Sequence, residues 1–253
     1  MSTRIAECFW RIFLSVLFFV ACLIINNKDM SLFHVNFFAT LYFNFKMLPL
    51  RLAIKLPFVL YFKIKFVNCN GHVVFPSNNV KFKMVQIGAN GSDMFGHLCT
   101  TIDVRGNIII RGSGIRVGHG SLLRVEKDGT LDFSEGSILG ARNIIFCCKS
   151  IKFEQNCLFS WDCQILDSDT HSIKDMVSGE IKPKTQDIVI GKNSWIGNHV
   201  IINKGTVLPE GTIVSAMSLL NKDYSIILNK NSVIGGIPAR KLRENKLRMN
   251  DKL

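Results

Sequence analysis

Between residues 188 and 226 the chain places an aliphatic side chain at every sixth position. These residues are Ile190, Ile196, Ile202, Leu208, Val214, Leu220 and Ile226. A small or β-branched residue follows four positions after each of the first five, at Ser194, Val200, Thr206, Thr212 and Ser218. A period of six fits neither the 3.6-residue helix nor the alternation of a flat strand. It predicts short strands separated by corners, with one aliphatic side chain per edge pointing into a narrow prism.

The same pattern begins earlier and is interrupted once. Cys147, Phe153, Phe159 and Ile165 keep the spacing of six, and the next member of the series is Ile190. Because a solenoid edge loses its register only where the chain loops out, residues 166–187 are predicted to form an extruded loop. Residues 71–150 carry short apolar pieces divided by glycines, which predicts earlier coils whose corners hold insertions.

Both ends of the chain depart from the repeat. Residues 1–66 are rich in Phe and Leu with scattered Lys and Arg, and are predicted to form an apolar, partly helical appendage. Pro238 is favoured in a first helical turn, so residues 237–250 are predicted to form a short C-terminal helix. The predicted domains are therefore 1–66, the coiled domain 67–236 with its loop, and 237–253.

The appendage allows several interpretations. Residues 12–25 are uncharged and mostly apolar, but shorter than the roughly 20 residues that span a bilayer. They fit an interfacial membrane helix, a helix packed on the end of the coils, or a spanning or signal segment. Farther on, basic and aromatic residues alternate, which suits either an anionic membrane surface or a cap on the open end of a solenoid. Contact with a membrane surface and capping of the solenoid are compatible roles.

Charge and cysteine content narrow the choice of partners. A net charge of +12 favours anionic partners, but no nucleic-acid-binding module is recognisable and no nucleic-acid partner is expected. Eight cysteines show neither disulfide-framework spacing nor a CxxC pair, which fits a reducing cytoplasm. Cys157 and Cys163 fall at small-residue positions of the repeat and are predicted to be packing residues.

The stretch IGKNSWIGNHVIINKG, followed by SAMSLLNKD and GGIPARKLRE, carries a family resemblance. It resembles the hexapeptide-repeat acyltransferases, especially maltose/galactoside and surface-polysaccharide O-acetyltransferases. The resemblance implies a left-handed parallel β-helix, a homotrimer with active sites between subunits, and acetyl-CoA as acyl donor. It also implies a sugar acceptor from a capsule, a lipopolysaccharide or another glycan precursor. The expected location is the cytoplasm, with the protein peripheral at the inner face of the membrane.

His171, in the extruded loop, is the predicted general base. Transfer of an acetyl group to a hydroxyl needs a group that removes the hydroxyl proton, and imidazole has a pKa near 6.5. Asp167 and Asp169 precede it, and either carboxylate could hold the tautomer of the ring. The resemblance carries the family's catalytic histidine over to His171. His199, beside the WIGN motif, is the competing candidate, although it is expected to point outward.

The resemblance also assigns binding residues. Trp195 is expected near the acceptor, and the expected CoA contacts are Asn198, Ala216, Asn221, Lys222, Arg240 and Arg243. Two departures from the family pattern stand out. Asn221 replaces a usual Thr, and Ser215 with Met217 replace the glycines that flank Ala216.

Other functions stay open at this point. The chain could N-acetylate an amino sugar or a xenobiotic, or it could be a non-catalytic trimeric scaffold that lost donor binding. A metal-dependent carbonic anhydrase on the same fold would need a close pair of histidines for zinc, and the six histidines here are widely separated. No metal is therefore expected.

Overall fold

The computed structural model describes residues 34–89, 95–96 and 98–249. Asn36–Leu253 forms one compact unit. The expectations for residues 1–33, including the apolar run at 12–25, lie outside the described residues. Across the described ranges, every helix is too short or too polar to cross a membrane.

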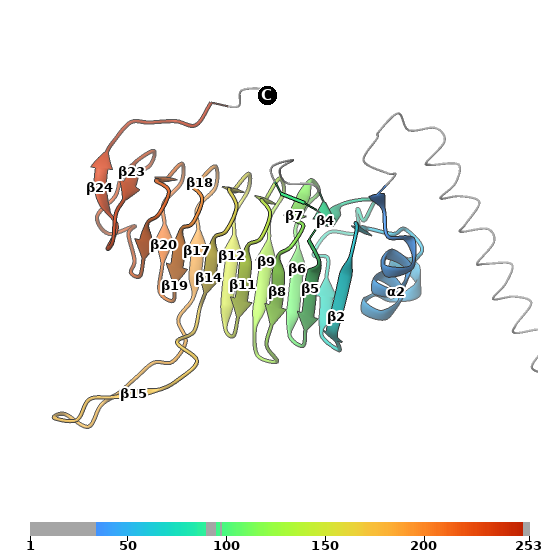
Figure 1. The fold of residues 1–253 in the computed structure, drawn as a ribbon, viewed down its shortest axis with the longest axis horizontal. Helices are drawn as coiled ribbons and strands as arrows, with labels where there is room; N and C mark the ends of the chain where they lie inside the picture. Colours follow the sequence, from blue (N-terminus) through green and yellow to red (C-terminus); the bar gives the residue numbers. More distant parts are fainter. Residues whose placement is uncertain (1–33, 90–94, 97, 250–253) are drawn as a thin grey trace, which may run out of the picture. The chain divides into compact units, whose positions relative to one another are not determined.

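Three parallel sheets form the three faces of a coiled stack (Figure 1). The first face contains β1 (Phe58–Leu60), β4 (Val85–Ala89), β7 (Ile115–Gly118), β10 (Ile138–Leu139), β13 (Leu158–Phe159), β18 (Trp195–Ile196), β21 (Ile213–Val214) and β23 (Val233–Gly235). The second contains β2 (Ile64–Cys69), β5 (Thr100–Val104), β8 (Leu122–Val125), β11 (Ile144–Cys147), β14 (Gln164–Leu166), β19 (Ile201–Asn203) and β22 (Leu219–Leu220). The third contains β3 (His72–Val74), β6 (Asn107–Ile110), β9 (Thr130–Phe133), β12 (Ser150–Phe153), β17 (Ile188–Ile190) and β20 (Val207–Leu208). From β1 to β20 each coil contributes one strand to each face, so the predicted parallel β-helix architecture is confirmed.

The spacing of six predicts the core correctly as far as Leu220. All members of the series from Cys147 to Leu220 are buried. Ile226 is the exception, with 79% of its surface exposed, because the chain leaves the regular coil after β22. Tyr224 and Leu228 are buried in this segment instead. Cys157 and Cys163 are fully buried, in agreement with their predicted packing role.

The small polar residues of the repeat close the corners. The hydroxyls of Ser194, Thr212 and Ser218 each donate to the carbonyl oxygen three residues earlier, at 2.7 Å. These bonds satisfy buried carbonyls where the chain turns and no strand neighbour is available. The corner between the first and second faces, here called the first corner, also needs a left-handed residue in each coil. Its left-handed residues are Phe62, Gly120, Arg142, Asp162, His199 and Met217, with φ between 53° and 72°.

The regular winding is interrupted at the corner between the second and third faces, here called the second corner. After β14 the chain leaves the stack, and it rejoins the stack at β17. The intervening segment contains the short antiparallel hairpin of β15 (Ile173–Lys174) and β16 (Ile181–Lys182). Figure 1 shows it as a long arm that projects from the side of the coils.

Two helices cover the N-terminal end of the stack. They are α2 (Phe37–Met47) and α3 (Leu50–Ala53). Asn44 donates to the Phe58 carbonyl at 2.7 Å and accepts from the Phe58 amide at 3.2 Å, which joins α2 to β1. Since β1 and β2 pair in parallel with β4 and β5, coil-type pairing begins at Phe58, before the domain boundary expected at residue 67.

The predicted C-terminal helix is wrong. Residues 240–243 form β24 (Arg240–Arg243), which pairs antiparallel with β23 at the end of the first face. The last coil leaves an open strand edge with unpaired amides and carbonyls, and an extended segment satisfies them where a helix would not. The Ala239 amide also donates to the Leu219 carbonyl at 2.8 Å, which fixes the chain at the entry to β24.

Aromatic side chains packed together in the core give a direct test of the coil packing. Phe153 is fully buried, with its ring 5.2 Å from those of both Phe133 and Phe159. We expect Phe153→Ala to lower the free energy of unfolding by about 3–5 kcal/mol, measured by urea denaturation. Lys152→Ala, on the same strand but facing outward, is the control and should change it by less than about 1 kcal/mol. Equal losses in the two variants would contradict the packing described here.

Candidate functional site

Asp167 fixes the point at which the arm leaves the coils. Its fully buried carboxylate accepts hydrogen bonds from the amides of Cys148, Lys149 and Ser150, at 2.7–2.8 Å. These amides belong to the second corner of the preceding coil. A carboxylate with three amide donors is held tightly, so Asp167 anchors the arm to the scaffold. The Gln186 amide returns to the Asp167 carbonyl at 3.0 Å, which closes the base of the arm.

Lys204 clamps the arm from the other side. Its ammonium group lies 2.5 Å from the Pro183 carbonyl oxygen and 2.5 Å from a carboxylate oxygen of Asp169. Lys204 follows β19, so this cation joins both strands of the arm to the next coil. Its side chain is only 17% exposed, which strengthens the charge interaction relative to one in open water. The base of the arm is thus held by the coil before it and the coil after it.

His171 lies in a tight turn just beyond this base. Its amide donates to the Asp169 carbonyl at 2.7 Å, and Thr170 before it has a left-handed backbone with φ of 62°. The Thr170 amide donates to the Ser168 hydroxyl at 3.0 Å. The turn leaves the His171 side chain exposed to solvent. Of the two candidate carboxylates, Asp167 is occupied by backbone amides, and Asp169 is paired with Lys204.

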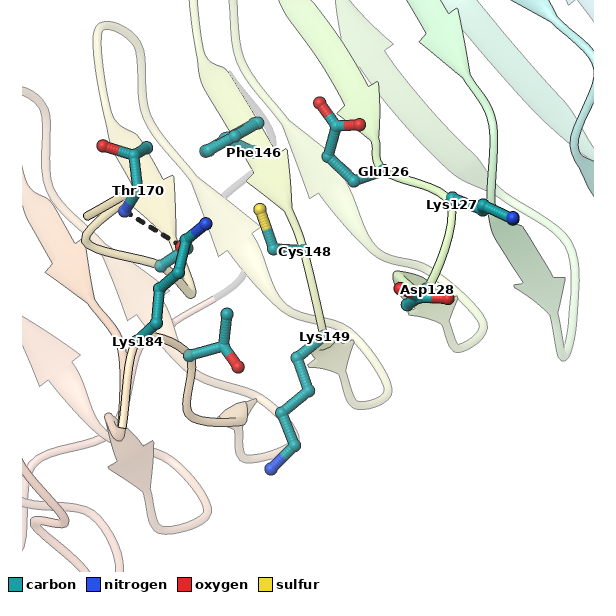
Figure 2. A pocket seen from close by; sticks show the side chains of 10 residues that line it. Glu126, Lys127, Asp128, Phe146, Cys148, Lys149, Thr170 and Lys184 are labelled. Carbon is teal, nitrogen blue, oxygen red and sulfur yellow. Dashed lines mark hydrogen bonds between the residues drawn. The ribbon is translucent and has the colours of Figure 1, made fainter. Parts of the chain in front are cut away.

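A pocket of about 620 Å³ lies between the base of the arm and the second corner of the earlier coils (Figure 2). It is lined by Glu126, Lys127, Asp128, Phe146, Cys148, Lys149, Ser168, Thr170, Lys184 and Thr185. In Figure 2 the side chains of Lys184 and Cys148 point into the space between arm and corner, whereas Lys127 points away from the arm. Thr170, in this lining, is the residue immediately before His171.

The pocket combines one aromatic surface with many hydrogen-bonding groups. Phe146 faces outward from β11, and the Arg124 guanidinium lies 5.2 Å from the centre of its ring. Glu126 is held by ion pairs with Arg124, at 2.5 Å, and with Arg105, at 3.6 Å. Burial raises the pKa of the Cys148 thiol, against the lowering effect of the Ser168 hydroxyl. Cys148 therefore stays protonated at neutral pH, which disfavours it as a nucleophile.

Three of the residues predicted to bind substrates lie together at the other end of the second face. Asn198 and Ala216 occupy the first corner in successive coils, where the Met217 amide donates to the Asn198 carbonyl at 3.0 Å. Trp195 is on β18, which leads into this corner, and is 38% exposed. Met217 has a φ of 58° and exposes 62% of its surface, so its side chain extends outward beside Ala216.

The remaining predicted donor contacts lie near the C-terminal end of the stack. Asn221 and Lys222 follow β22, and the Lys222 ammonium lies 5.5 Å from the centre of the Tyr224 ring. Arg240 and Arg243 are exposed on β24. Neither arginine forms an ion pair with another residue in the described part of the chain, whereas their neighbour Lys241 is bound to Glu244 at 3.0 Å.

Apart from the residues near the C-terminal end, the structure thus places the predicted site residues in two separate groups. Trp195, Asn198 and Ala216 lie on or beside the first corner, whereas His171 and the pocket lie at the second. The strands of the second face run between these two corners. A reaction that uses both groups therefore cannot take place at one point of a single chain.

The competing histidine belongs to a different cluster. His199 Nε2 lies 3.8 Å from the Asp162 carboxylate, which is also paired with Arg142. The Arg142 guanidinium in turn lies 4.1 Å from the centre of the Phe95 ring. His199 itself is exposed at the first corner, as expected from the sequence. Within the described residues, no group of three His, Cys, Asp or Glu side chains is arranged to hold a metal ion.

The pocket residues were missed in the sequence because they belong to irregular corners. Residues 126–128 and 148–149 have no motif, and Phe146 is only an outward position on a strand. Their relation becomes visible once β8, β11 and β14 are aligned, because Arg124, Phe146 and Leu166 are then direct neighbours. One feature of the sequence could have located the pocket. The arm leaves the stack after β14, at the same corner where residues 126–128 and 148–149 form the turns of two earlier coils.

Comparison with known proteins places this chain near sugar O-acetyltransferases. No protein-family model matches it. It is 40% identical to galactoside O-acetyltransferase of Escherichia coli over 57 residues, which is 22% of this chain and 26% of that protein. It is 26% identical to polysialic acid O-acetyltransferase of Neisseria meningitidis over 131 residues, which is 49% of this chain and 60% of that protein. The match therefore spans less than two thirds of either relative.

Among solved structures, the polysialic acid O-acetyltransferase OatWY aligns with a TM-score of 0.47 and 20% sequence identity. The alignment covers 76% of this chain and 92% of that one. The resemblance to hexapeptide-repeat O-acetyltransferases that the sequence predicts is confirmed by the curated relatives.

The clamp at the base of the arm can be tested by proteolysis. We expect Lys204→Gln to release Asp169 and the Pro183 carbonyl, so that trypsin cuts the arm at Lys174 and Lys184 several times faster than in the wild-type protein. The global unfolding temperature should stay nearly the same, because the core does not contain Lys204. Lys230→Gln, which removes an exposed ion pair to Glu210 elsewhere, is the matched control. Cleavage at the wild-type rate in Lys204→Gln would show that the clamp does not restrain the arm.

Proposed function

We propose that this chain is an acyltransferase that moves an acetyl group from acetyl-CoA to a hydroxyl of a sugar, with His171 as general base. The observation that carries the proposal is the placement of an exposed imidazole on a doubly clamped arm, beside a pocket suited to a polyhydroxylated ligand. The similarity to galactoside and polysialic acid O-acetyltransferases supports the reaction class.

His171 has the chemistry that the reaction requires. Its ring is exposed, so a substrate hydroxyl can reach a ring nitrogen and pass its proton to it as the new ester bond forms. Its backbone is held by the turn at Asp169, and Lys204 fixes that turn to the scaffold. Because Asp167 is committed to three amides, we assign the orienting role to Asp169, acting mainly through its hold on the turn.

The pocket suits a sugar acceptor. Sugar rings have apolar faces and polar edges, and Phe146 offers a flat apolar surface surrounded by Ser168, Thr170 and Lys184. An acceptor seated there would have hydroxyls close to the turn that presents His171. A pocket of about 620 Å³ has room for more than one sugar ring, which is compatible with a glycan acceptor.

The exposed cations fit a donor that carries several phosphates. Arg240 and Arg243 have no carboxylate partner in the described ranges, and unpaired guanidinium groups are suited to bind phosphate. Ala216 offers little bulk at the first corner, where we expect Asn198 and Ala216 to contact the pantetheine arm. Met217 leaves this region narrower than a glycine would, although its side chain points to solvent. When bound, the thioester supplies the activated acetyl group.

We further propose that the working unit is a homotrimer in which each site is shared. Asn198, Ala216 and Trp195 lie on or beside the first corner and His171 lies at the second, so a complete site needs two chains. The arm also exposes four apolar side chains, Ile173, Met176, Val177 and Ile181, which a neighbouring subunit would cover. The arm of one subunit would then bring His171 to the first corner of the next.

Replacement of His171 tests the assignment of the base. We expect His171→Ala to lower kcat by about a hundredfold to ten-thousandfold in an acetyl-CoA turnover assay with galactosides and sialic acid oligomers as acceptors. CoA binding, measured by calorimetry, should be nearly unchanged, because the donor residues lie elsewhere. His199→Ala is the control and should keep most of the activity. Wild-type kcat in His171→Ala would exclude the assignment, and absence of CoA binding in the wild-type protein would indicate a non-catalytic scaffold.

Mixed oligomers test whether the site is shared. His171→Ala and Trp195→Ala should each be nearly inactive alone. Co-expressed in equal amounts, they should regain about a quarter of the wild-type activity, because about one interface in four then combines an intact arm with an intact corner. If both residues acted within one chain, mixing would restore nothing.

A further inference from the structure

Helices α2 and α3 present one side to the coils and expose apolar residues on the other side. Phe43 and Asn44 are fully buried against β1 and β2. On the opposite side, five large apolar residues are exposed, one of which, Tyr42, also packs its ring 4.9 Å from that of Phe66 on β2. They are Phe38 (77%), Tyr42 (49%), Phe45 (41%), Leu50 (65%) and Ile54 (49%), and they are called the aromatic face below. A cap for the solenoid needs only the buried side, so the aromatic face requires another explanation.

The spacing of three of these residues places them on one side of α2. Phe38, Tyr42 and Phe45 are separated by four and three positions, which places them on one side of α2. Leu50 begins α3 and Ile54 follows it, and both are exposed. Single exposed apolar residues are common on protein surfaces, but a concentration of five within residues 38–54 is typical of an interaction surface.

The charges around the face are all positive. Lys46, Arg51 and Lys55 are exposed on and after the helices, and Lys63 and Lys65 are exposed on the neighbouring segment at β2. The sequence contains no Asp or Glu from residue 30 to residue 92. In the described part of the chain, none of these five cations forms an ion pair, whereas surface lysines farther along do, as Lys192 does with Glu210.

We propose that the aromatic face docks on an anionic lipid surface, with α2 lying in the plane of the interface. Aromatic rings prefer the boundary between headgroups and acyl chains, and lysine and arginine side chains beside them reach the phosphates. A second copy of the chain would bring the same positive charges together, so the charge pattern opposes self-association through this face. Docking here would hold the coiled stack at a membrane through α2 and α3.

Vesicle sedimentation of the full chain tests this proposal. The wild-type protein should sediment with vesicles of phosphatidylcholine and phosphatidylglycerol, and much less with phosphatidylcholine alone or at high salt. Arg51→Gln with Lys55→Gln should weaken binding by about fivefold for each charge removed. Phe38→Ser with Leu50→Ser should also weaken it, even at low salt, because these side chains would be withdrawn from the acyl boundary.

The control removes equal charge from another exposed surface. Lys174→Gln with Lys182→Gln, on the arm, should bind vesicles as the wild-type protein does. Thermal unfolding of each variant checks that the fold is kept. The proposal is overturned if the wild-type protein does not sediment with anionic vesicles, or if the helix variants bind as well as the arm variants. Binding to soluble polyglutamate without binding to vesicles would also overturn it, and would identify an acidic protein as the partner.

Discussion

The register between stacked coils is the constraint on which the rest of this structure depends. Each coil has only two or three residues per strand in its later turns, so no coil buries its apolar side chains alone. Ile145, Ile165 and Ile202 lie over one another in neighbouring strands of the second face. A residue inserted within a strand would shift every later side chain out of this column. In these later coils, extra residues are therefore accepted where the chain turns a corner, whereas the longer early strands β2 and β4 each contain a bulge.

The arm follows directly from this constraint. It leaves at the second corner, where Asp167 satisfies three amides of the preceding turn and Lys204 holds the returning strand. The same two contacts that preserve the register also present His171 at a defined place and form one wall of the pocket. Scaffold and site are thus connected by a few charged side chains. A rigid frame that carries its chemistry on a fixed loop is a common solution in proteins.

The two ends of the stack are closed in different ways. The last coil completes its open edge by adding β24, which leaves Arg240 and Arg243 exposed along the added strand. The first coil is covered by α2, whose Asn44 pairs with β1 while its other side remains apolar and bare. A single helix thus closes the hydrophobic core on one side and offers a surface rich in aromatic and basic residues on the other.

The sequence by itself determined the stacked coils, the buried column from Cys147 to Leu220 and the place where the arm leaves, because a repeat of six is a local property of the chain. It also pointed to His171 through a family resemblance. Only the tertiary structure decided that residues 240–243 form a strand, that Tyr224 is buried where Ile226 was expected, and that Asp167 serves the backbone. The pocket at Phe146 and the separation of His171 from Asn198 also emerged only there. These features depend on which residues become neighbours after the chain has turned several corners, and no pattern within one repeat contains that information.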